Sequence, residues 1–221
     1  MKPQFPKLSI FETFKTKREQ LTGEAIRQRY IISHLAREDT STLTTRTAIA
    51  QNIAKKNNLL WKNIYSGVFR DLDEILIPLD IVVEAGRLPL KPGPKAVQES
   101  GIPYYQLTTK GLLVSLSIYD FDQKDSVLDK FLSKAEIKEK GFADVIKTLV
   151  KISPKFTYSM FEIYVRAFCE GKIKNLMPFR ISEFREISGK TFTIQNEILT
   201  GFVTLSKSKQ LVVLNFLSKF T

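Results

Sequence analysis

Apolar residues recur at helical spacing soon after the start of the chain. In "GEAIRQRYIISHLARED", Ile26, Tyr30, Ile31 and Leu35 recur at spacings of four, one and four residues and share one face of a helix. Thr22 directly precedes this pattern and is a candidate N-cap. The pattern predicts a first amphipathic helix with these four side chains directed into a core.

Two further helices are predicted immediately afterwards. The first follows a threonine-rich entry, ends at the polar "KKNN", and has an apolar stripe made of Ile49, Ala50, Ile53 and Ala54. The second lies in "LLWKNIYSGVFRDLDEILI", ends near Pro78, and has a stripe made of Leu60, Ile64, Val68, Leu72 and Ile75. Three short helices with a tight turn between the last two are typical of a helix-turn-helix.

The pattern changes to short β-branched segments after Pro78. "LDIVVEAGRL" and "IPYYQL" each predict a strand, and "PLKPGPKAVQESG" between them contains three prolines and two glycines. The sequence therefore predicts a β-hairpin with a long, stiff tip. "TTKGLLVSLSIYDF" then favours a helix, although its β-branched and aromatic residues leave a strand open.

The rest of the chain is predicted to be helical. Segments such as "TYSMFEIYVRAFCEG" present a broad apolar face from Phe161, Tyr164, Val165 and Phe168. We expect an N-terminal arm at 1–22, a domain of three helices and a hairpin at 23–118, and a helical C-terminal domain at 119–221. The predicted fold class is mostly α with a small β-hairpin.

Charge gives the first indication of function. The 221 residues include 34 Lys and Arg against 23 Asp and Glu, a net charge of +11 with a pI near 9.6. A basic surface attracts polyanions because neutralised phosphates release condensed counterions. Basic residues occur in both halves of the chain, so charge alone does not locate a binding surface.

Candidate catalytic chemistry is sparse. His34 is the only histidine and Cys169 the only cysteine, which is too few for a zinc site or a nucleophile paired with a base. The carboxylates of "DFDQKD" lack the glycine and final glutamate of a calcium loop, and no phosphate-binding glycine loop occurs. We expect no enzyme activity, no metal and no cofactor. A redox role for Cys169 stays open.

The hairpin region resembles a known family. "VVEAGRL", a basic loop and "YYQLTTKG" are similar to the end of the winged helix-turn-helix domain of prokaryotic transcriptional regulators. The matching residues are Glu84, Ala85, Gly86, Tyr105, Leu107, Thr108, Lys110 and Gly111. The resemblance covers roughly residues 24–118, and the loop is longer and richer in proline than is usual in that family.

This resemblance implies double-stranded DNA as the partner and a recognition helix in the major groove. The hydroxyls of Thr44 and Thr45 and the guanidinium of Arg46 would hold phosphate at the start of the second predicted helix. The third helix would offer Trp61, Lys62, Asn63, Tyr65, Ser66 and Arg70. The wing would reach the flanking backbone or minor groove through Arg87, Lys91 and Lys95.

Several alternatives remain at this stage. Asp71, Asp73 and Glu74 would repel phosphate if they faced it, which keeps a protein-interaction module open. A replication or plasmid-maintenance DNA binder would have the same sequence pattern as a regulator. By resemblance we expect a homodimer through the C-terminal helices. No membrane span is expected, and without an apolar leader the expected location is the cytoplasm.

Overall fold

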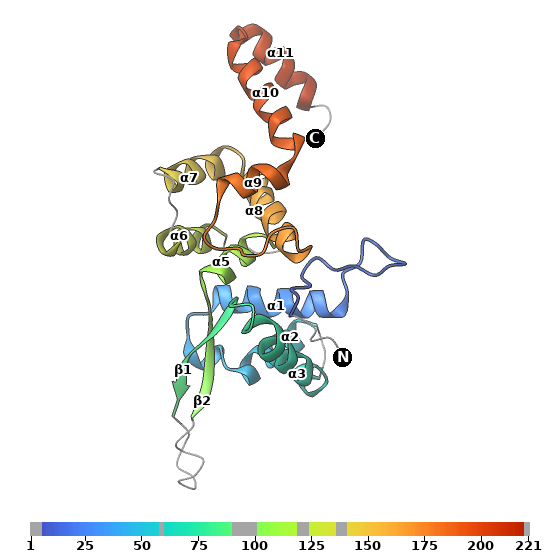
Figure 1. Cartoon of the computed structure of the whole chain (residues 1–221), viewed down its shortest axis with the longest axis vertical. Coiled ribbons are helices and arrows are strands. Elements are labelled where there is room, and N and C mark those ends of the chain that lie inside the picture. The colour runs from blue at the N-terminus through green and yellow to red at the C-terminus, as the bar shows by residue number, and fades with distance from the viewer. Residues whose placement is uncertain (1–5, 58–59, 90–100, 119–123, 136–140, 219–221) are drawn as a thin grey trace. The chain divides into compact units, whose positions relative to one another are not determined.

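The computed structural model describes residues 6–57, 60–89, 101–118, 124–135 and 141–218 (Figure 1). The side chains of 61–63, 181, 190 and 191 are not described. The chain forms two compact units, Met1–Arg180 and Ile181–Thr221. Helices dominate the described residues, and their one sheet is a two-stranded antiparallel hairpin. The expectation of a mostly α fold with a small β-hairpin is confirmed.

Helix α1 (Gly23–Arg37) begins at the predicted cap, where Thr22 Oγ1 accepts a hydrogen bond from Ala25 N at 3.2 Å. Its buried face differs from the predicted one. Ile31 and Leu35 are buried as expected, but Ile26 is 40% exposed and Ile32 is fully buried. The face is broader than one stripe because α1 contacts α2, α3 and α5, so that the centre of the helix is covered on several sides.

Helix α2 (Arg46–Lys56) follows a short 3-10 turn, Ser41–Leu43, and its stripe is buried as predicted. Helix α3 (Trp61–Arg70) packs against α2 and continues into a π-helical segment, Asp71–Leu76. Val68, Leu72 and Leu76 are each fully buried. A π turn contains more residues than an α turn, so the position that faces the core after Leu72 is the fourth residue along and not the third. Leu76 therefore takes the place predicted for Ile75. Leu60, the first residue of the predicted stripe, is 73% exposed.

Strands β1 (Val82–Leu88) and β2 (Ile102–Leu107) form the predicted hairpin. Val82 pairs with Leu107 and Leu88 with Ile102, and the register shifts at a bulge between Glu84 and Gly86. The next segment is helical, not a strand, and forms α5 (Thr109–Leu116). Helix α5 is buried along almost its whole length because it contacts α1 on one side and α6 and α8 on another.

Helices α6 (Lys124–Lys134), α7 (Phe142–Ile152) and α8 (Pro154–Cys169) belong to the same compact unit as α1 to α5. Phe131 and Phe161 meet edge-to-face in their core, with ring centroids 6.0 Å apart. Tyr158 donates a hydrogen bond to Asp125 Oδ1 at 3.0 Å. We expected a division near residue 118, but the compact unit extends to Arg180 because α6 and α8 pack on α5.

Residues 8–11 pack onto the fold, whereas residues 14–20 are exposed. Leu8 and Ile10 are buried, and Ser9 N donates to Gln28 Oε1 of α1 at 2.9 Å. The half-buried Phe11 lies against two guanidinium groups, with Arg29 Cζ 5.5 Å and Arg166 Cζ 4.3 Å from its ring centroid. This segment therefore contacts both α1 and α8.

The second unit consists of α9 (Ile181–Ser188), α10 (Lys190–Thr204) and α11 (Lys207–Leu217). Phe184 of α9 packs on Phe192 of α10, with ring centroids 5.0 Å apart. Many apolar side chains of α10 and α11 are at least half exposed, namely Ile194, Ile198, Leu199, Val203, Leu211, Val212, Leu214, Phe216 and Leu217. Packing of α10 against α11 covers only one side of each helix, so the apolar side chains on their other sides stay exposed.

Candidate nucleic-acid interface

The two threonines before α2 hold the fold together locally. Thr45 is the N-cap of α2, and its hydroxyl accepts a hydrogen bond from Ala48 N at 3.3 Å. Thr44 Oγ1 donates to Ser41 O, and Thr44 O accepts a 3.1 Å hydrogen bond from Tyr105 N of β2. Both threonines are buried, so their hydroxyls are engaged within the protein and have little exposed surface for a phosphate.

Arg46 is anchored inside a cluster. Its guanidinium forms an ion pair with Asp73, and its Cζ lies 4.4 Å from the ring centroid of Phe69 and 5.3 Å from that of Tyr105. Cation–π contacts and an ion pair fix one orientation of this long side chain. Arg46 therefore joins α2, α3 and β2, and this role differs from the phosphate contact that the sequence suggested.

The carboxylate of Asp71 is buried and neutralised by Arg27. Arg27 Nε donates to Asp71 Oδ2 at 2.5 Å, and Arg27 Nη2 donates to Oδ1 at 3.0 Å. Burial raises the pKa of Asp71, while the hydrogen bonds and charge of Arg27 oppose that rise. The two acidic residues nearest to α3 are thus paired with arginines, whereas Glu74 is exposed.

The outer surface of α3 carries part of the predicted constellation. Ser66 is exposed, and Tyr65 is half-buried against Phe69 with ring centroids 4.5 Å apart. Arg70 is half exposed and lies 3.7 Å from Glu24, a distance at which a surface ion pair contributes little. Trp61, Lys62 and Asn63 form the first turn of α3, but their side chains lie outside the described residues.

The hairpin carries one described candidate, Arg87, whose Nε donates to Glu84 Oε1 at 2.7 Å across the bulge. Gly86 occupies this bulge with a φ of +154°, and a Cβ there would come within 2.8 Å of the Tyr104 hydroxyl. The bulge therefore requires glycine. Lys91 and Lys95 lie outside the described residues.

The residues that carry the family resemblance close the hairpin. Thr108 is the N-cap of α5, and its hydroxyl accepts from Gly111 N at 3.1 Å and donates to Asp80 O at 2.6 Å. Lys110 Nζ lies 3.0 Å from Asp80 Oδ2. A Cβ on Gly111 would lie only 2.1 Å from Ile81 O. The stretch "YYQLTTKG" is thus structural, since it joins the end of β2 to Asp80 and Ile81, the two residues before β1.

The structure describes His34 and Cys169, the two residues that the sequence considered for catalytic or metal chemistry. No cluster of three or more His, Cys, Asp or Glu that could hold a metal occurs among them. His34 is buried, and its Nε2 lies 2.8 Å from Leu43 O. Burial raises the pKa of the Cys169 thiol to about 12, which leaves almost no reactive thiolate near neutral pH. None of the helices in the described part of the chain is long and apolar enough to span a bilayer.

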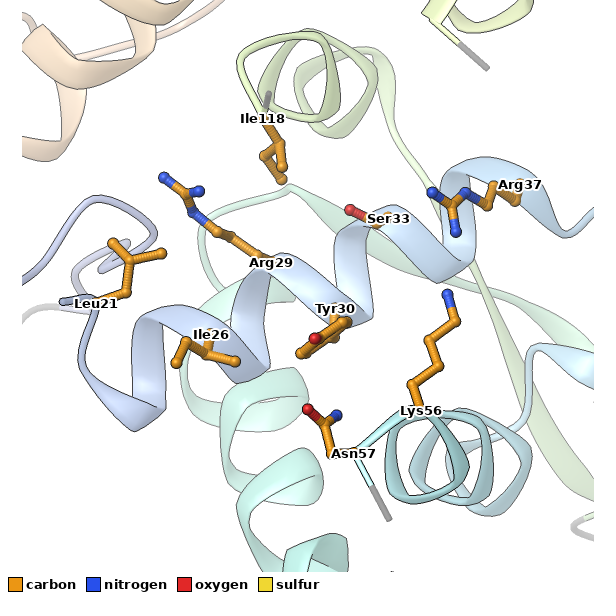
Figure 2. A pocket seen from close by; sticks show the side chains of 9 residues that line it. All are labelled: Leu21, Ile26, Arg29, Tyr30, Ser33, Arg37, Lys56, Asn57 and Ile118. Atoms are coloured by element: carbon orange, nitrogen blue, oxygen red, sulfur yellow. The ribbon is translucent and has the colours of Figure 1, made fainter. Parts of the chain in front are cut away.

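One basic cluster was not singled out by the sequence. Arg29, Arg37 and Lys56 line a cavity beside α1, and none of them belongs to a recognisable motif (Figure 2). The three residues come from two helices, so only the packing of α1 against α2 brings them together.

Comparisons with protein-family models, curated proteins and solved structures give no significant match.

Proposed function

We propose that residues 23–118 form a winged helix-turn-helix domain that binds double-stranded DNA, and that the protein is a cytoplasmic transcriptional regulator. The observation that carries this proposal is the attachment of β2 to the entry of α2. Tyr105 N bonds to Thr44 O, and Tyr104 forms a bridge with Thr45. A hairpin fixed to the helix pair in this way would present its tip and α3 to one duplex.

The proposed contacts come from α3 and the hairpin. The first turn of α3 places Lys62 and Asn63 near its N-terminus, where a recognition helix reaches base edges, and Ser66 and Arg70 continue along the helix. Arg87, Lys91 and Lys95 would contact the flanking backbone. Thr44, Thr45 and Arg46 take a supporting role in this proposal, because they position α2 and β2.

The neutralised acids also support a DNA-facing α3. Asp71 is bound by Arg27, and Asp73 by Arg46, so neither carboxylate stands as a bare negative charge beside the helix. A paired carboxylate repels phosphate much less than an isolated one because its charge is compensated within a few ångströms. Asp71 and Asp73 are therefore a weaker argument against DNA binding than they are in the sequence alone.

Fluorescence anisotropy with a labelled random-sequence duplex tests this proposal. The wild-type protein is expected to bind at low salt, and its affinity should fall steeply as salt increases because phosphate contacts release counterions. Absence of binding at low salt would contradict the proposal. Binding whose affinity does not change with salt would contradict it as well.

We further propose that residues 181–221 mediate homodimerisation. The supporting observation is the exposed apolar surface of α10 and α11, which is unusual for a solvated helix pair. Two copies would cover this surface by forming a four-helix arrangement. Light scattering coupled to size exclusion should report a dimer for the wild type and a monomer for Val203→Glu combined with Val212→Glu. A monomeric wild type would instead favour a different protein partner for this unit.

A further inference from the structure

A short basic loop, residues 13–21, precedes α1 in the first compact unit. An antiparallel bridge joins Thr13 to Leu21 at its base, and the chain between them reads "FKTKREQ". Within the loop, Phe14 N donates a hydrogen bond to Gln20 O at 3.0 Å. Because backbone contacts close the basic loop on itself, its side chains project from a defined position.

The base of the basic loop is attached to the core on both sides. Ile10, shortly before the loop, is fully buried. Thr22, directly after it, caps α1, and its backbone N donates to Glu12 O at 2.9 Å. This attachment orders the loop before any partner arrives, so that less conformational entropy remains to be lost on binding.

The basic loop presents positive charge to solvent. Lys15, Lys17 and Arg18 are exposed, and none of the three forms an ion pair with a carboxylate in the described part of the chain. Glu19 is the only acidic residue of the loop, so three cations and one anion leave a net charge of +2. Exposed lysine and arginine side chains of this kind are suited to phosphate oxygens.

The basic loop lies next to the C-terminal end of α3. Glu24, in the first turn of α1, is 3.7 Å from Arg70, the last residue of α3. Figure 1 shows the loop extending beyond the start of α1, and in this view α3 lies between the loop and the hairpin. The proposed recognition helix therefore has a basic element on each of two sides.

We propose that the basic loop contacts the phosphate backbone of DNA on the side of α3 opposite to the hairpin. This inference rests on the proposed function of α3 and the hairpin. A helix in the major groove has a phosphate backbone on each side of it, so the hairpin and the loop would each meet one. Backbone contacts carry no sequence information, and the loop would therefore fix the orientation of the protein on the duplex.

The salt dependence of DNA affinity tests this assignment in the full chain, with a labelled random-sequence duplex of about two helical turns. The loop variant combines Lys15→Gln, Lys17→Gln and Arg18→Gln. Its slope of log affinity against log salt should be shallower than that of the wild type by roughly 0.9 for each phosphate contact removed. The control variant removes three exposed cations of the same compact unit, Lys151→Gln, Lys155→Gln and Lys174→Gln. A wild-type slope in the loop variant, or equal changes in the two variants, would overturn the proposal.

Lysine acetylation followed by mass spectrometry gives a second readout that needs no variant. Bound duplex should slow the acetylation of Lys15 and Lys17 severalfold and leave Lys151 and Lys155 unchanged. Phe14 is 47% exposed beside these cations, a combination that also suits an anionic membrane surface. Protection of Lys15 and Lys17 by phosphatidylserine vesicles but not by DNA would overturn the proposal.

The two proposals fail in different ways. If the wild-type protein does not bind the duplex at low salt, the proposed function is wrong and the loop contact is wrong with it. If the wild type binds and variants of α3 and the hairpin lose affinity, but the loop variant keeps the wild-type slope, only the loop contact is wrong.

Discussion

Arg27 and Asp71 form a bidentate ion pair, with Nε–Oδ2 and Nη2–Oδ1 distances of 2.5 and 3.0 Å. The pair joins α1 to the π-helical segment after α3. The Asp71 side chain is fully buried and that of Arg27 is only 19% exposed, so water screens their attraction weakly. This contact fixes the end of α3 relative to α1, and with it the orientation of the proposed recognition helix.

Removal of the Asp71 carboxylate should be strongly destabilising. Asp71→Ala leaves a largely buried guanidinium without its partner, and we expect a loss of about 3–5 kcal/mol in the free energy of unfolding. Urea denaturation followed by circular dichroism measures the loss. Glu74→Ala is the control, since Glu74 is exposed and removal of its carboxylate should cost about 0.5 kcal/mol or less. Equal costs in the two variants would contradict this account.

The absence of a side chain at Gly67 leaves room for the Arg27 side chain to extend past α3 to Asp71. A Cβ at Gly67 would lie 2.9 Å from Arg27 Nε, which the ion pair holds in place. Gly67→Ala should therefore destabilise the protein by about 1–3 kcal/mol despite the higher helix propensity of alanine. In an Arg27→Ala background the clash is absent, and the same change should be neutral or stabilising by up to about 1 kcal/mol. Denaturation of all four proteins in this cycle measures the coupling, and additive effects would show that Arg27 does not impose the glycine.

Gly111 should tolerate no side chain. Gly111→Ala would place a Cβ 2.1 Å from Ile81 O, and a backbone carbonyl cannot move away as a flexible side chain can. We expect a loss of about 3 kcal/mol or more, measured by thermal denaturation. Gly23→Ala is the control, because nothing lies within 4 Å of a Cβ at Gly23. A variant as stable as the control would mean that the junction between β2 and α5 is looser than described.

Cys169 should be unreactive in the native protein. Burial raises the pKa of its thiol to about 12, and the thiolate is the nucleophile, so alkylation by iodoacetamide at pH 8 should be more than tenfold slower than in urea. The sign of the pH dependence follows from the raised pKa: the native rate should still be increasing tenfold per pH unit between about pH 10 and 11, where an ordinary thiol with a pKa of about 8.5 has levelled off. Mass spectrometry of quenched samples gives both rates. Rapid native labelling would restore the redox role that the sequence left open.

The sequence predicts the order of α1, α2, α3 and the hairpin well, because each depends on local periodicity and on turn-forming residues. Val68 and Leu72 are buried as the 3.6-residue repeat requires. The predicted buried stripe of α3 is wrong after Leu72, because the chain forms a π turn there that no local sequence pattern predicts. The predicted burial of Ile26 is wrong for a related reason, because its position beside a cavity depends on the packing of α2 and on Ile118.

The candidate site is harder to predict, because the role of a charged side chain depends on distant partners. Arg46 has the residue type and position of a phosphate ligand, yet its partners are Asp73, Phe69 and Tyr105. No sequence pattern singles out Arg27, although its side chain neutralises Asp71, which lies 44 positions away. Such pairs form only once the tertiary packing has brought the helices together.

The most direct test of the central claim is the slope of log affinity against log salt for DNA binding in two charge-matched variants. One combines Lys62→Ala, Arg70→Ala, Lys91→Ala and Lys95→Ala. The control combines Lys151→Ala, Lys155→Ala, Lys174→Ala and Arg185→Ala, four exposed cations outside the proposed interface. We expect the first variant to lose affinity and to have a slope that is shallower by roughly 0.9 for each phosphate contact removed, while the control keeps the wild-type slope. Identical slopes in the two variants would contradict DNA binding by α3 and the hairpin.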